Sequence, residues 1–476
     1  MADNSAPAEQ CATAELARFL AAARYESIPD DVLTRTKHLI LDGLGCAMFG
    51  AKLEGSRRAV EALRELDGEG SATVWGWPHK APPTTAALLN GAFVHAYELD
   101  DYHAFGPLHS GACVLPAALA TAEQVGAVSG RQFLLASTLG FEVGPRIGMA
   151  MGGVQLVNRG WHCGAIYGVL SAVSAAGKLR NLDSAEFEDA IGIAATQASG
   201  LIAANRGSMV KRMHMGMAAR SGVVGASLAS KGFTGIKQVL DLEYGGLLST
   251  FCRDDPYDLS VLTAGLGEDW EVRRISIKPA FCTMTGIHSS IEAALALRDA
   301  PGFDISSIES IQIGVAEAMF HHGGWQLSRP AKVISAQMNY AYAVAVTLLD
   351  GAPSVPQFSE ERINRDDVWQ VLPSIAVHRD PEVESWGDDA RWGARMEVTF
   401  TNGKKEEIAV RHAKGHYLRP HSNEEIGAKY DLMTSYVMDR SDAEQLKHVV
   451  LNLEQFSSII DLAKSLSIDV ASPLSD

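Results

Sequence analysis

The stretch GAIYGVLSAVSAAGK, residues 164–178, decides the fold class of this 476-residue chain. It consists almost entirely of small and aliphatic residues and carries no charge before its final lysine. A helix that is apolar on every side is buried, and small side chains let neighbouring helices approach closely. Residues 185–202 are similarly rich in alanine, glycine and isoleucine. We therefore expect tightly packed, buried helices at the centre of the fold.

Helical patterns extend outward from this core in both directions. Most of the first 270 residues read as helices, including an amphipathic run at 33–50 that ends in glycine. After about residue 415 the chain is helical again, and we expect these late helices to pack against the early ones. The other predicted helices of these two segments are 112–128, 213–232, 424–438, 443–453 and 457–466.

Between these helical segments the pattern changes to short strands alternating with helices. The stretches VRRISIK (272–278) and IESIQIGV (308–315) alternate apolar and polar residues, which predicts strands. Asn402-Gly403 separates two further alternating runs and predicts a hairpin with a type I′ turn, which needs positive φ at both central residues. Those runs are 396–400 and 406–410; a strand at 374–377 and helices at 287–298 and 335–349 complete this part.

The predicted fold is therefore mainly α, with two domains. A chain of this length exceeds the roughly 250–300 residues at which single cores stop growing. We predict a large all-helical domain from residues 1–270 and 415–476. Residues 271–414 would form a smaller α+β domain, inserted as a lid.

Composition excludes several classes of protein. The formal net charge of -16 argues against a nucleic-acid binder, which needs a basic face. The six cysteines form no CxxC pair, so zinc ribbons and common iron–sulfur spacings are unsupported. Residues 1–10 resemble neither a signal nor a transit peptide, and we find no run long and apolar enough for a membrane span. These features together predict a cytoplasmic protein without membrane or nucleic-acid partners.

Histidines and carboxylates gather in HAYELDDYH, residues 95–103, and His109 follows closely. Histidine can donate or accept a proton near neutral pH, and a nearby carboxylate fixes its tautomer. The run precedes a predicted buried helix, so we expect it on a loop. Two interpretations stay open: a proton-transfer site, or capping of the helix by Asp100 and Asp101 beside solvated histidines.

Two further groups contain a histidine or a cation beside apolar helices. His162, between glycines in GWHCGA (160–165), would stand at a helix N-terminus, a position suited to anions; the alternative is a core histidine bonded to a backbone carbonyl. In NRGSMVKRMH (205–214), a helix from about Lys211 would place Lys211 and His214 on one face. Lysine and arginine suit a carboxylate-binding site, and the apolar residues that follow favour this over a solvated basic face.

Two more residues are weaker candidates by themselves. Lys278 ends a predicted strand, where a lysine is more often plain surface, and Tyr342 lies in a helical run, where a tyrosine usually packs in the core. The chain has no P-loop, no GxGxxG followed by a helix, no GxSxG and no HExxH. Adjacent Asp100 and Asp101 point in different directions in regular structure, so we do not expect a shared metal site.

Six stretches, in this order, resemble the MmgE/PrpD family. The resemblance spans nearly the whole chain, and the matching sequences are ELDDYH…LHSGACVLPA (98–117), GWHCGAIYG (160–168), AIGIAATQASGL (190–201), MVKRMHMGMAARSG (209–222), ISIKPAFC (275–282) and AKGHYLRPHSNEEIGAKY (413–430). The family includes 2-methylcitrate dehydratases, cis-aconitate decarboxylases and an iminodisuccinate epimerase. The stretches PLHS, GFEVGPRIG and HHGGW look most like the fungal type of cis-aconitate decarboxylase.

The resemblance implies a fold, a chemistry and a set of site residues. It implies a helical domain with a smaller α+β lid, a homodimer, no metal and no organic cofactor, and an active site between the domains. It implies a lyase that acts on a small di- or tricarboxylate by moving a proton next to a carboxylate. Decarboxylation of cis-aconitate to itaconate is the leading interpretation, and 2-methylcitrate dehydration and dicarboxylate epimerisation stay open as alternatives. Carried over by motif, the implied catalytic residues are His109, His162, Lys211, Lys278 and Tyr342, and the implied substrate-binding residues are Glu98 and Tyr102.

Overall fold

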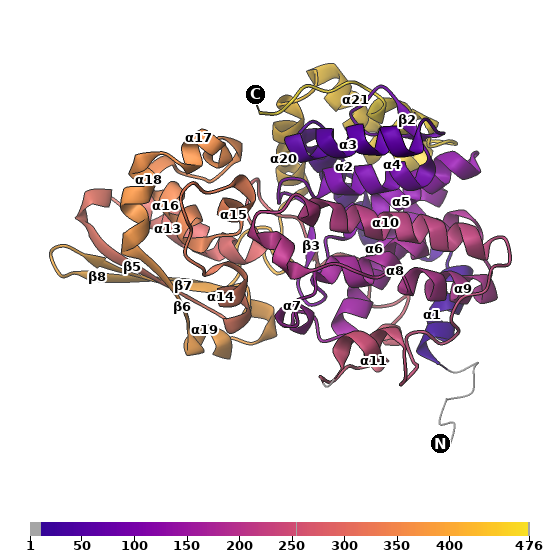
Figure 1. Ribbon diagram of the computed structural model, residues 1–476, viewed down its shortest axis with the longest axis horizontal. Helices are drawn as coiled ribbons and strands as arrows, with labels where there is room; N and C mark the ends of the chain where they lie inside the picture. The colour runs from indigo at the N-terminus through magenta and orange to yellow at the C-terminus, as the bar shows by residue number, and fades with distance from the viewer. Residues whose placement is uncertain (1–10, 254, 475–476) are drawn as a thin grey trace.

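The computed structural model describes residues 11–253 and 255–474, and they form two parts that lie side by side (Figure 1). Residues 1–10, where we predicted no targeting signal, lie outside the described residues. The larger part is helical, and the smaller part contains a four-stranded sheet with helices around it. The predicted fold class, mainly α with a smaller α+β part, is confirmed.

The larger part is built from the first twelve α-helices and the last three. Two short strands, β1 (Ala72–Thr73) and β2 (Lys80–Ala81), form a small separate hairpin. The helices are α1 (Ala12–Ala22), α2 (Asp30–Gly50), α3 (Glu54–Asp67), α4 (Pro83–Val94), α5 (Ser110–Val125), α6 (Gly130–Ala150), α7 (Gln155–Asn158), α8 (Cys163–Leu179), α9 (Ser184–Ala195), α10 (Val210–Ala229), α11 (Leu247–Cys252), α12 (Ser260–Thr263), α20 (Asn423–Ser435), α21 (Arg440–Leu451) and α22 (Ile460–Leu466).

Helix α8 lies at the centre of this part and packs against α5, α6 and α10. All of its residues except Lys178 are buried. Glycine allows the closest approaches: a Cβ on Gly222 of α10 would lie 2.4 Å from the Cβ of Ala172 on α8. The small residues that identified this helix in the sequence therefore set the spacing of the core.

The C-terminal helices return to the helical part, where α20 packs against α2 (Figure 1). A buried ion pair joins them, with Lys429 Nζ 2.6 Å from Asp42 Oδ1. Lys429 also donates to the carbonyl of Leu99 at 2.5 Å. Helix α20 thus holds in place the loop that follows α4.

The smaller part is a four-stranded sheet with the order β6-β5-β7-β8. Strands β5 and β6 are parallel, whereas β5 pairs antiparallel with β7, and β7 with β8. Helices α13 and α16 pack together and against the sheet. The elements are β5 (Ile308–Val315), β6 (Ile375–Arg379), β7 (Ala394–Phe400), β8 (Lys405–Val410), α13 (His288–Arg298), α14 (Glu317–Gly323), α15 (Val333–Gln337), α16 (Tyr340–Asp350), α17 (Glu360–Ile363), α18 (Asp366–Val371) and α19 (Pro381–Ser385).

The hairpin at Asn402-Gly403 is present, but its turn differs from the prediction. Of these two residues only Gly403 has a positive φ, at 82°. Gly403 N–H donates to the Phe400 carbonyl at 2.8 Å, and the Asn402 side chain accepts from Lys404 N–H at 2.9 Å. The type I′ prediction is wrong, because a longer loop needs the left-handed conformation only at its glycine.

The strand predicted at 272–278 is also mostly wrong. Residues Glu271–Arg274 form a 3₁₀ turn, and only β4 (Ile275–Ser276) is extended. Strand β4 pairs with β3 (Tyr102–His103) of the helical part instead of joining the large sheet. Arg273 lies 2.7 Å from Asp31 of α2, and this ion pair is available only beside the helical part.

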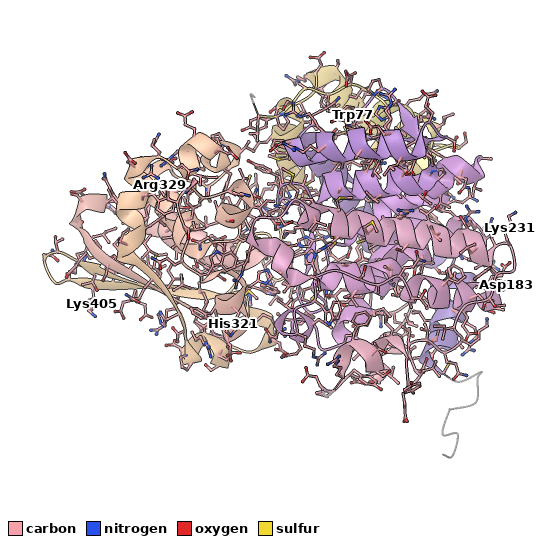
Figure 2. All side chains as sticks on the ribbon, in the orientation of Figure 1. Trp77, Asp183, Lys231, His321, Arg329 and Lys405 are labelled. Carbon is pink, nitrogen blue, oxygen red and sulfur yellow. The ribbon has the colours of Figure 1, made fainter. Side chains whose placement is uncertain are left out.

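None of the helices in the described segments is long and apolar enough to cross a lipid bilayer. Figure 2 shows side chains projecting from the surface of both parts, with Lys405 at one end of the molecule and Asp183 and Lys231 at the other. His321, on α14, lies near the boundary between the two parts (Figure 2).

Candidate active site

The loop between α4 and α5 carries three of the seven predicted site residues, Glu98, Tyr102 and His109. It runs from His95, which caps the C-terminus of α4, to His109, which precedes α5. Within it, β3 is held by its pairing with β4. Glu98 has a φ of 60°, in the left-handed region that side chains other than glycine rarely adopt. Such strain persists where surrounding contacts over-determine the conformation.

Those contacts come from two neighbouring cations at the start of α10. Lys211 Nζ and Arg212 Nη1 both bind Glu98 Oε1. Arg212 also donates to the His95 carbonyl, in the same loop as Glu98, at 3.1 Å. A further hydrogen bond joins it to the Gln337 side chain of α15 at 2.8 Å. Glu98 is therefore fixed by both cations at the boundary between the two parts.

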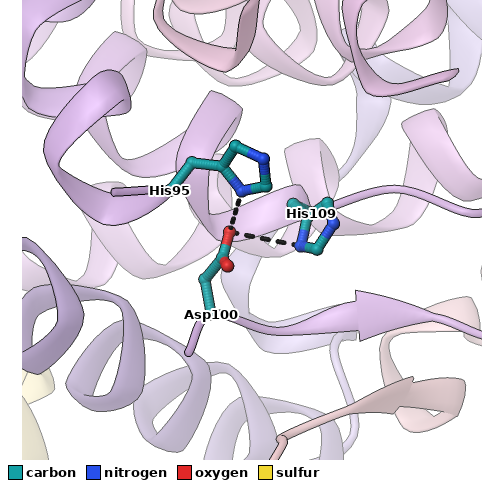
Figure 3. Close-up of side chains that lie close together, drawn as sticks. All are labelled: His95, Asp100 and His109. Atoms are coloured by element: carbon teal, nitrogen blue, oxygen red, sulfur yellow. Dashed lines mark hydrogen bonds and ion pairs between the residues drawn. The ribbon is translucent and has the colours of Figure 1, made fainter. Parts of the chain in front are cut away.

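Asp100 lies between two histidine rings (Figure 3). Its Oδ2 is 2.9 Å from His95 Nδ1 and 3.2 Å from His109 Nδ1. His109 Nδ1 is also 2.8 Å from the Asp101 carbonyl, so this nitrogen faces only acceptors and carries a hydrogen. Nε2 is then the nitrogen of His109 that is left for a ligand. On the other side, His95 Nε2 lies 3.1 Å from Lys211 Nζ, so His95 joins Lys211 to Asp100.

Burial and neighbouring charges shift several pKa values in this cluster. Burial lowers the pKa of His95 to about 3 and that of Lys211 to about 8. Burial alone would raise the pKa of Glu98, but Lys211, Arg212 and Lys278 hold it well below its ordinary value. Likewise, the pKa of Asp100 lies well below its usual range because His109 and His95 outweigh the effect of burial. The cluster therefore contains two ionised carboxylates beside three cationic side chains.

Lys278 follows β4 and is fully buried next to both carboxylates. Its Nζ is 3.9 Å from Glu98 Oε2 and 3.8 Å from Asp100 Oδ1. These separations exceed a hydrogen bond, and Nζ has no hydrogen-bond partner among the described residues. An unsatisfied buried ammonium is expensive, and the attraction of the two nearby carboxylates offsets part of that cost.

His162 occupies the N-terminus of α8, as the sequence predicted, but its partner is another histidine. Its Nδ1 lies 2.9 Å from Nδ1 of His214 on α10. Burial lowers the pKa of both rings, and that of His162 lies well below 6.5. Both are therefore neutral at neutral pH.

A cavity of about 660 Å³, counting its open mouth, adjoins this cluster between the two parts. Most polar side chains of the lining come from the helical part, which also contributes apolar residues such as Leu108, Val154 and Ile202, whereas the smaller part contributes mostly apolar ones. The lining includes Glu98, Tyr102, His109, His162, Asn205 and Lys211 from the former, and Met284, Thr285, Met319, His322, Met338 and Trp392 from the latter.

The structure brings together six of the seven residues predicted for the site. Glu98, Tyr102, His109, His162 and Lys211 line the cavity, and Lys278 lies directly behind Glu98. Tyr342 is not among them: it is buried in α16, and its hydroxyl donates to the Gln357 carbonyl within the smaller part. The role assigned to Tyr342 stays a prediction that no contact with the cluster supports.

Four cluster residues were not among the predicted site residues. His95, Asp100 and Arg212 lay inside the quoted motifs, but spacing alone could not show that they contact Glu98, His109 and Lys211. His322 comes from α14 of the smaller part, where burial lowers its pKa to about 4 and its Nε2 lies 3.4 Å from Asn205 Nδ2. The pair His321-His322 in the stretch HHGGW was the available signal for it.

His95, Asp100 and His109 are of the types that bind metal ions, and their ligand atoms lie within 4.8 Å of one another. Two features favour a hydrogen-bonded array instead. The nitrogens that face Asp100 are already hydrogen-bonded, and the other nitrogen of His95 faces the Lys211 ammonium. A divalent cation beside this ammonium would be repelled.

Residues 14–260 match the MmgE/PrpD N-terminal domain, and residues 281–455 match the MmgE/PrpD C-terminal domain. The chain belongs to the MmgE/PrpD family. This MmgE/PrpD chain is 38% identical over 478 residues to a protein of Aspergillus terreus named cis-aconitate decarboxylase, covering 97% of each chain. It is 37% identical to the cis-aconitate decarboxylase-like protein oryM of Aspergillus oryzae, covering 96% of this chain and 97% of that one. The human cis-aconitate decarboxylase is 29% identical over 90% of this chain and 88% of its own.

Proposed function

We propose that this protein is a lyase that decarboxylates cis-aconitate to itaconate. The observation that carries this proposal is near-full-length similarity, at 38% identity, to a protein named cis-aconitate decarboxylase. The geometry is consistent with it, because the cavity combines cations for carboxylates with histidines that can transfer a proton. The 2-methylcitrate dehydratase and dicarboxylate epimerase alternatives need the same groups, but the relatives described above carry neither name.

The reaction requires one proton for every molecule of carbon dioxide released. The vinylic carbon beside one carboxylate takes the proton, and the double bond shifts toward the neighbouring methylene carbon. The bond from that carbon to its carboxylate breaks, and the bonding electrons complete the new terminal alkene. A trianion and a proton thus give a dianion and carbon dioxide. An enzyme for this reaction must hold three carboxylates and deliver a proton to carbon.

Lys211 and Lys278 are our candidates for binding substrate carboxylates. Lys211 lines the cavity, and Lys278 has an ammonium without a hydrogen-bond partner among the described residues. The three cations Lys211, Arg212 and Lys278 exceed the two carboxylates Glu98 and Asp100 with which they interact. This excess positive charge would stabilise the negative charge of the substrate and the transition state.

His109 and His162 are the candidate proton-transfer residues, and the geometry favours His109 as the acid. Asp100, 3.2 Å from His109 Nδ1, would stabilise the imidazolium that carries the proton. The resulting positive ring would present Nε2–H to the cavity that His109 lines. Glu98 would hold Lys211 in place, and Tyr102 would form part of the wall.

The family resemblance supports further parts of the proposal. We propose that the protein is a cytoplasmic homodimer that needs neither a metal ion nor an organic cofactor. We also propose that residues 271–414 act as a lid over a site built mainly by residues 1–270 and 415–476.

Proton NMR of the product mixture tests the reaction. The purified protein, treated with EDTA, is incubated separately with cis-aconitate and with 2-methylcitrate. We expect the two methylene-alkene signals of itaconate to grow only in the first sample. A 2-methylaconitate methyl signal in the second would instead identify a dehydratase. No change in either sample would overturn the proposed reaction and direct attention to dicarboxylates that can be epimerised.

A further inference from the structure

The mechanism leaves His214, a buried histidine beside His162, without a role. His214 is on the second turn of α10 and does not line the cavity, yet its ring is 5.0 Å from that of His162, centroid to centroid. The two rings meet through identical atoms, Nδ1 to Nδ1, at 2.9 Å. Because both rings are neutral at neutral pH, one Nδ1 must carry the hydrogen and the other must accept it. The tautomers of the two residues are thereby coupled.

The backbone around the pair is built to hold this contact. The His162 N–H donates to the Gly200 carbonyl at 3.0 Å, which fixes the start of α8. Gly200 has a φ of 152°, and a Cβ there would lie 2.5 Å from the Cβ of Ala165 and 3.5 Å from His214 Nδ1. Glycine is therefore required for this segment to lie so close to the His214 ring.

The remaining nitrogens of the two rings face different surroundings. Neither Nε2 has a hydrogen-bond partner among the described residues, and neither is one of the fully buried atoms left unpaired. Both atoms are therefore accessible. His162 lines the cavity, whereas His214, which is 9% exposed, does not. The atom of His162 offered to a ligand is thus Nε2, and its state depends on which ring holds the shared hydrogen.

We propose that His214 is a positioning residue that donates its Nδ1–H to His162 and so holds His162 as the tautomer with hydrogen on Nε2. His162 then donates a neutral hydrogen bond to a substrate carboxylate, and His109 delivers the proton. The opposite arrangement would turn a lone pair of His162 toward a polyanion, which is repulsive. This inference rests on the proposed function, since only an anionic ligand selects between the two arrangements.

Nitrogen-15 NMR of histidine-labelled enzyme reads the tautomer directly, because a ring nitrogen without hydrogen resonates far downfield of one with hydrogen. The His162 signals are assigned by their loss in His162→Gln. We expect hydrogen on Nε2 and none on Nδ1 when tricarballylate, an unreactive tricarboxylate, is bound. Hydrogen on Nδ1 of His162 in the tricarballylate complex would overturn the inference whether or not the enzyme decarboxylates cis-aconitate.

Two variants of the same size separate hydrogen-bond direction from packing. His214→Asn keeps an amide N–H at about the position of Nδ1, whereas His214→Asp offers only acceptor oxygens and would draw the hydrogen onto Nδ1 of His162. We expect His214→Asp to raise the KM for cis-aconitate at least about tenfold, as expected for loss of a hydrogen bond to a charged group, and Asn to recover most of this loss. Equal KM values for the two variants would contradict the proposal.

His38→Leu is the matched control. His38 is also buried, but it lies on α2, and its Nδ1 is 2.8 Å from the Thr34 carbonyl of its own helix. We expect this variant to lose some thermal stability while its KM and the His162 nitrogen signals stay at the values of the unmodified enzyme. A tenfold rise in KM from His38→Leu would show that any buried imidazole has this effect, and would overturn the specific role of His214.

Discussion

Several side chains of the proposed active-site cluster have two neighbours of opposite or complementary character. Glu98 is strained at its backbone and bound at its side chain by Lys211 and Arg212. Asp100 accepts from two histidines, and one of these, His95, also faces Lys211. A change at one residue is therefore felt by its neighbours, and effects within the cluster should not add.

At the residue scale, Lys211→Ala and His109→Ala test the proposed roles. Each should lower kcat/KM for cis-aconitate by about a hundredfold or more, the usual effect of removing one group that stabilises developing charge. Both proteins should still fold, because Arg212 continues to hold Glu98 and Asp100 keeps His95. Steady-state kinetics and circular dichroism are the measurements.

Lys178→Ala is a control for the loss of a partly buried lysine. Lys178 Nζ donates to the carbonyls of Leu20 and Ala21, away from the cavity. We expect lower stability but an unchanged KM. A fully active Lys211→Ala variant would remove Lys211 from the mechanism.

At the scale of helices and strands, glycine determines how closely the central helices pack. Gly222→Ala on α10 places a methyl group 2.4 Å from Ala172 Cβ and 2.5 Å from its backbone, where no flexible side chain can move aside. We expect a loss of about 1–3 kcal/mol in unfolding free energy, as for other overpacked cores. Urea denaturation followed by circular dichroism measures it.

Gly55→Ala on α3 is the matched helical control. A Cβ at Gly55 meets nothing nearer than the Met209 side chain at 3.7 Å. Since alanine favours helix more than glycine does, we expect no loss and a gain of up to about 1 kcal/mol. Equal destabilisation by both substitutions would show that helix contact is not the cause.

The periodicity of apolar residues correctly predicted elements with a regular pattern of burial. It failed where contacts with residues distant in the sequence determine the local structure. The apolar run of α8 and the alternation of β5 correspond closely to the observed elements. Residues 272–278 alternate as well, but Arg273 pairs with Asp31 and β4 pairs with β3, and neither partner is near in sequence.

The site was predictable to the extent that its residues lie in motifs. Motifs located Glu98, His109, His162 and Lys211. They could not show that Asp100 bridges two histidines, that His214 backs His162, or that His322 reaches the cavity from the other part of the molecule. The motifs also could not show that the Tyr342 hydroxyl donates a hydrogen bond to the Gln357 carbonyl.

At the scale of the whole molecule, buried neutral histidines make stability depend on pH. Burial lowers the pKa of both His95 and His288 from 6.5 to about 3. Below pH 6.5 the unfolded chain binds protons that the folded protein cannot, so stability is fully present above pH 6.5 and is lost as the pH falls toward 3. Between pH 6.5 and pH 5 each histidine should remove roughly 2 kcal/mol of unfolding free energy.

Urea titrations at pH 7 and pH 5 measure this loss. In His288→Gln, the difference in unfolding free energy between pH 7 and pH 5 should shrink by the contribution of one histidine. The same pH dependence in the variant and the unmodified protein would mean that His288 is not the neutral, buried group described above.

The short β3–β4 ladder has a consequence for how such a protein can diversify. Its two strands belong to segments more than 170 residues apart; one lies between Glu98 and His109, and the other ends two residues before Lys278. Consider a chimaera in which the smaller part is replaced by that of a relative. The loop that carries Glu98 and His109 would keep its position only if the junction between the two sequences falls after this ladder. The cavity wall formed by Met319 and His322 lies beyond that point. New substrate preferences could therefore be grafted in one block, with the proposed proton-transfer residues His109 and His162 inherited unchanged.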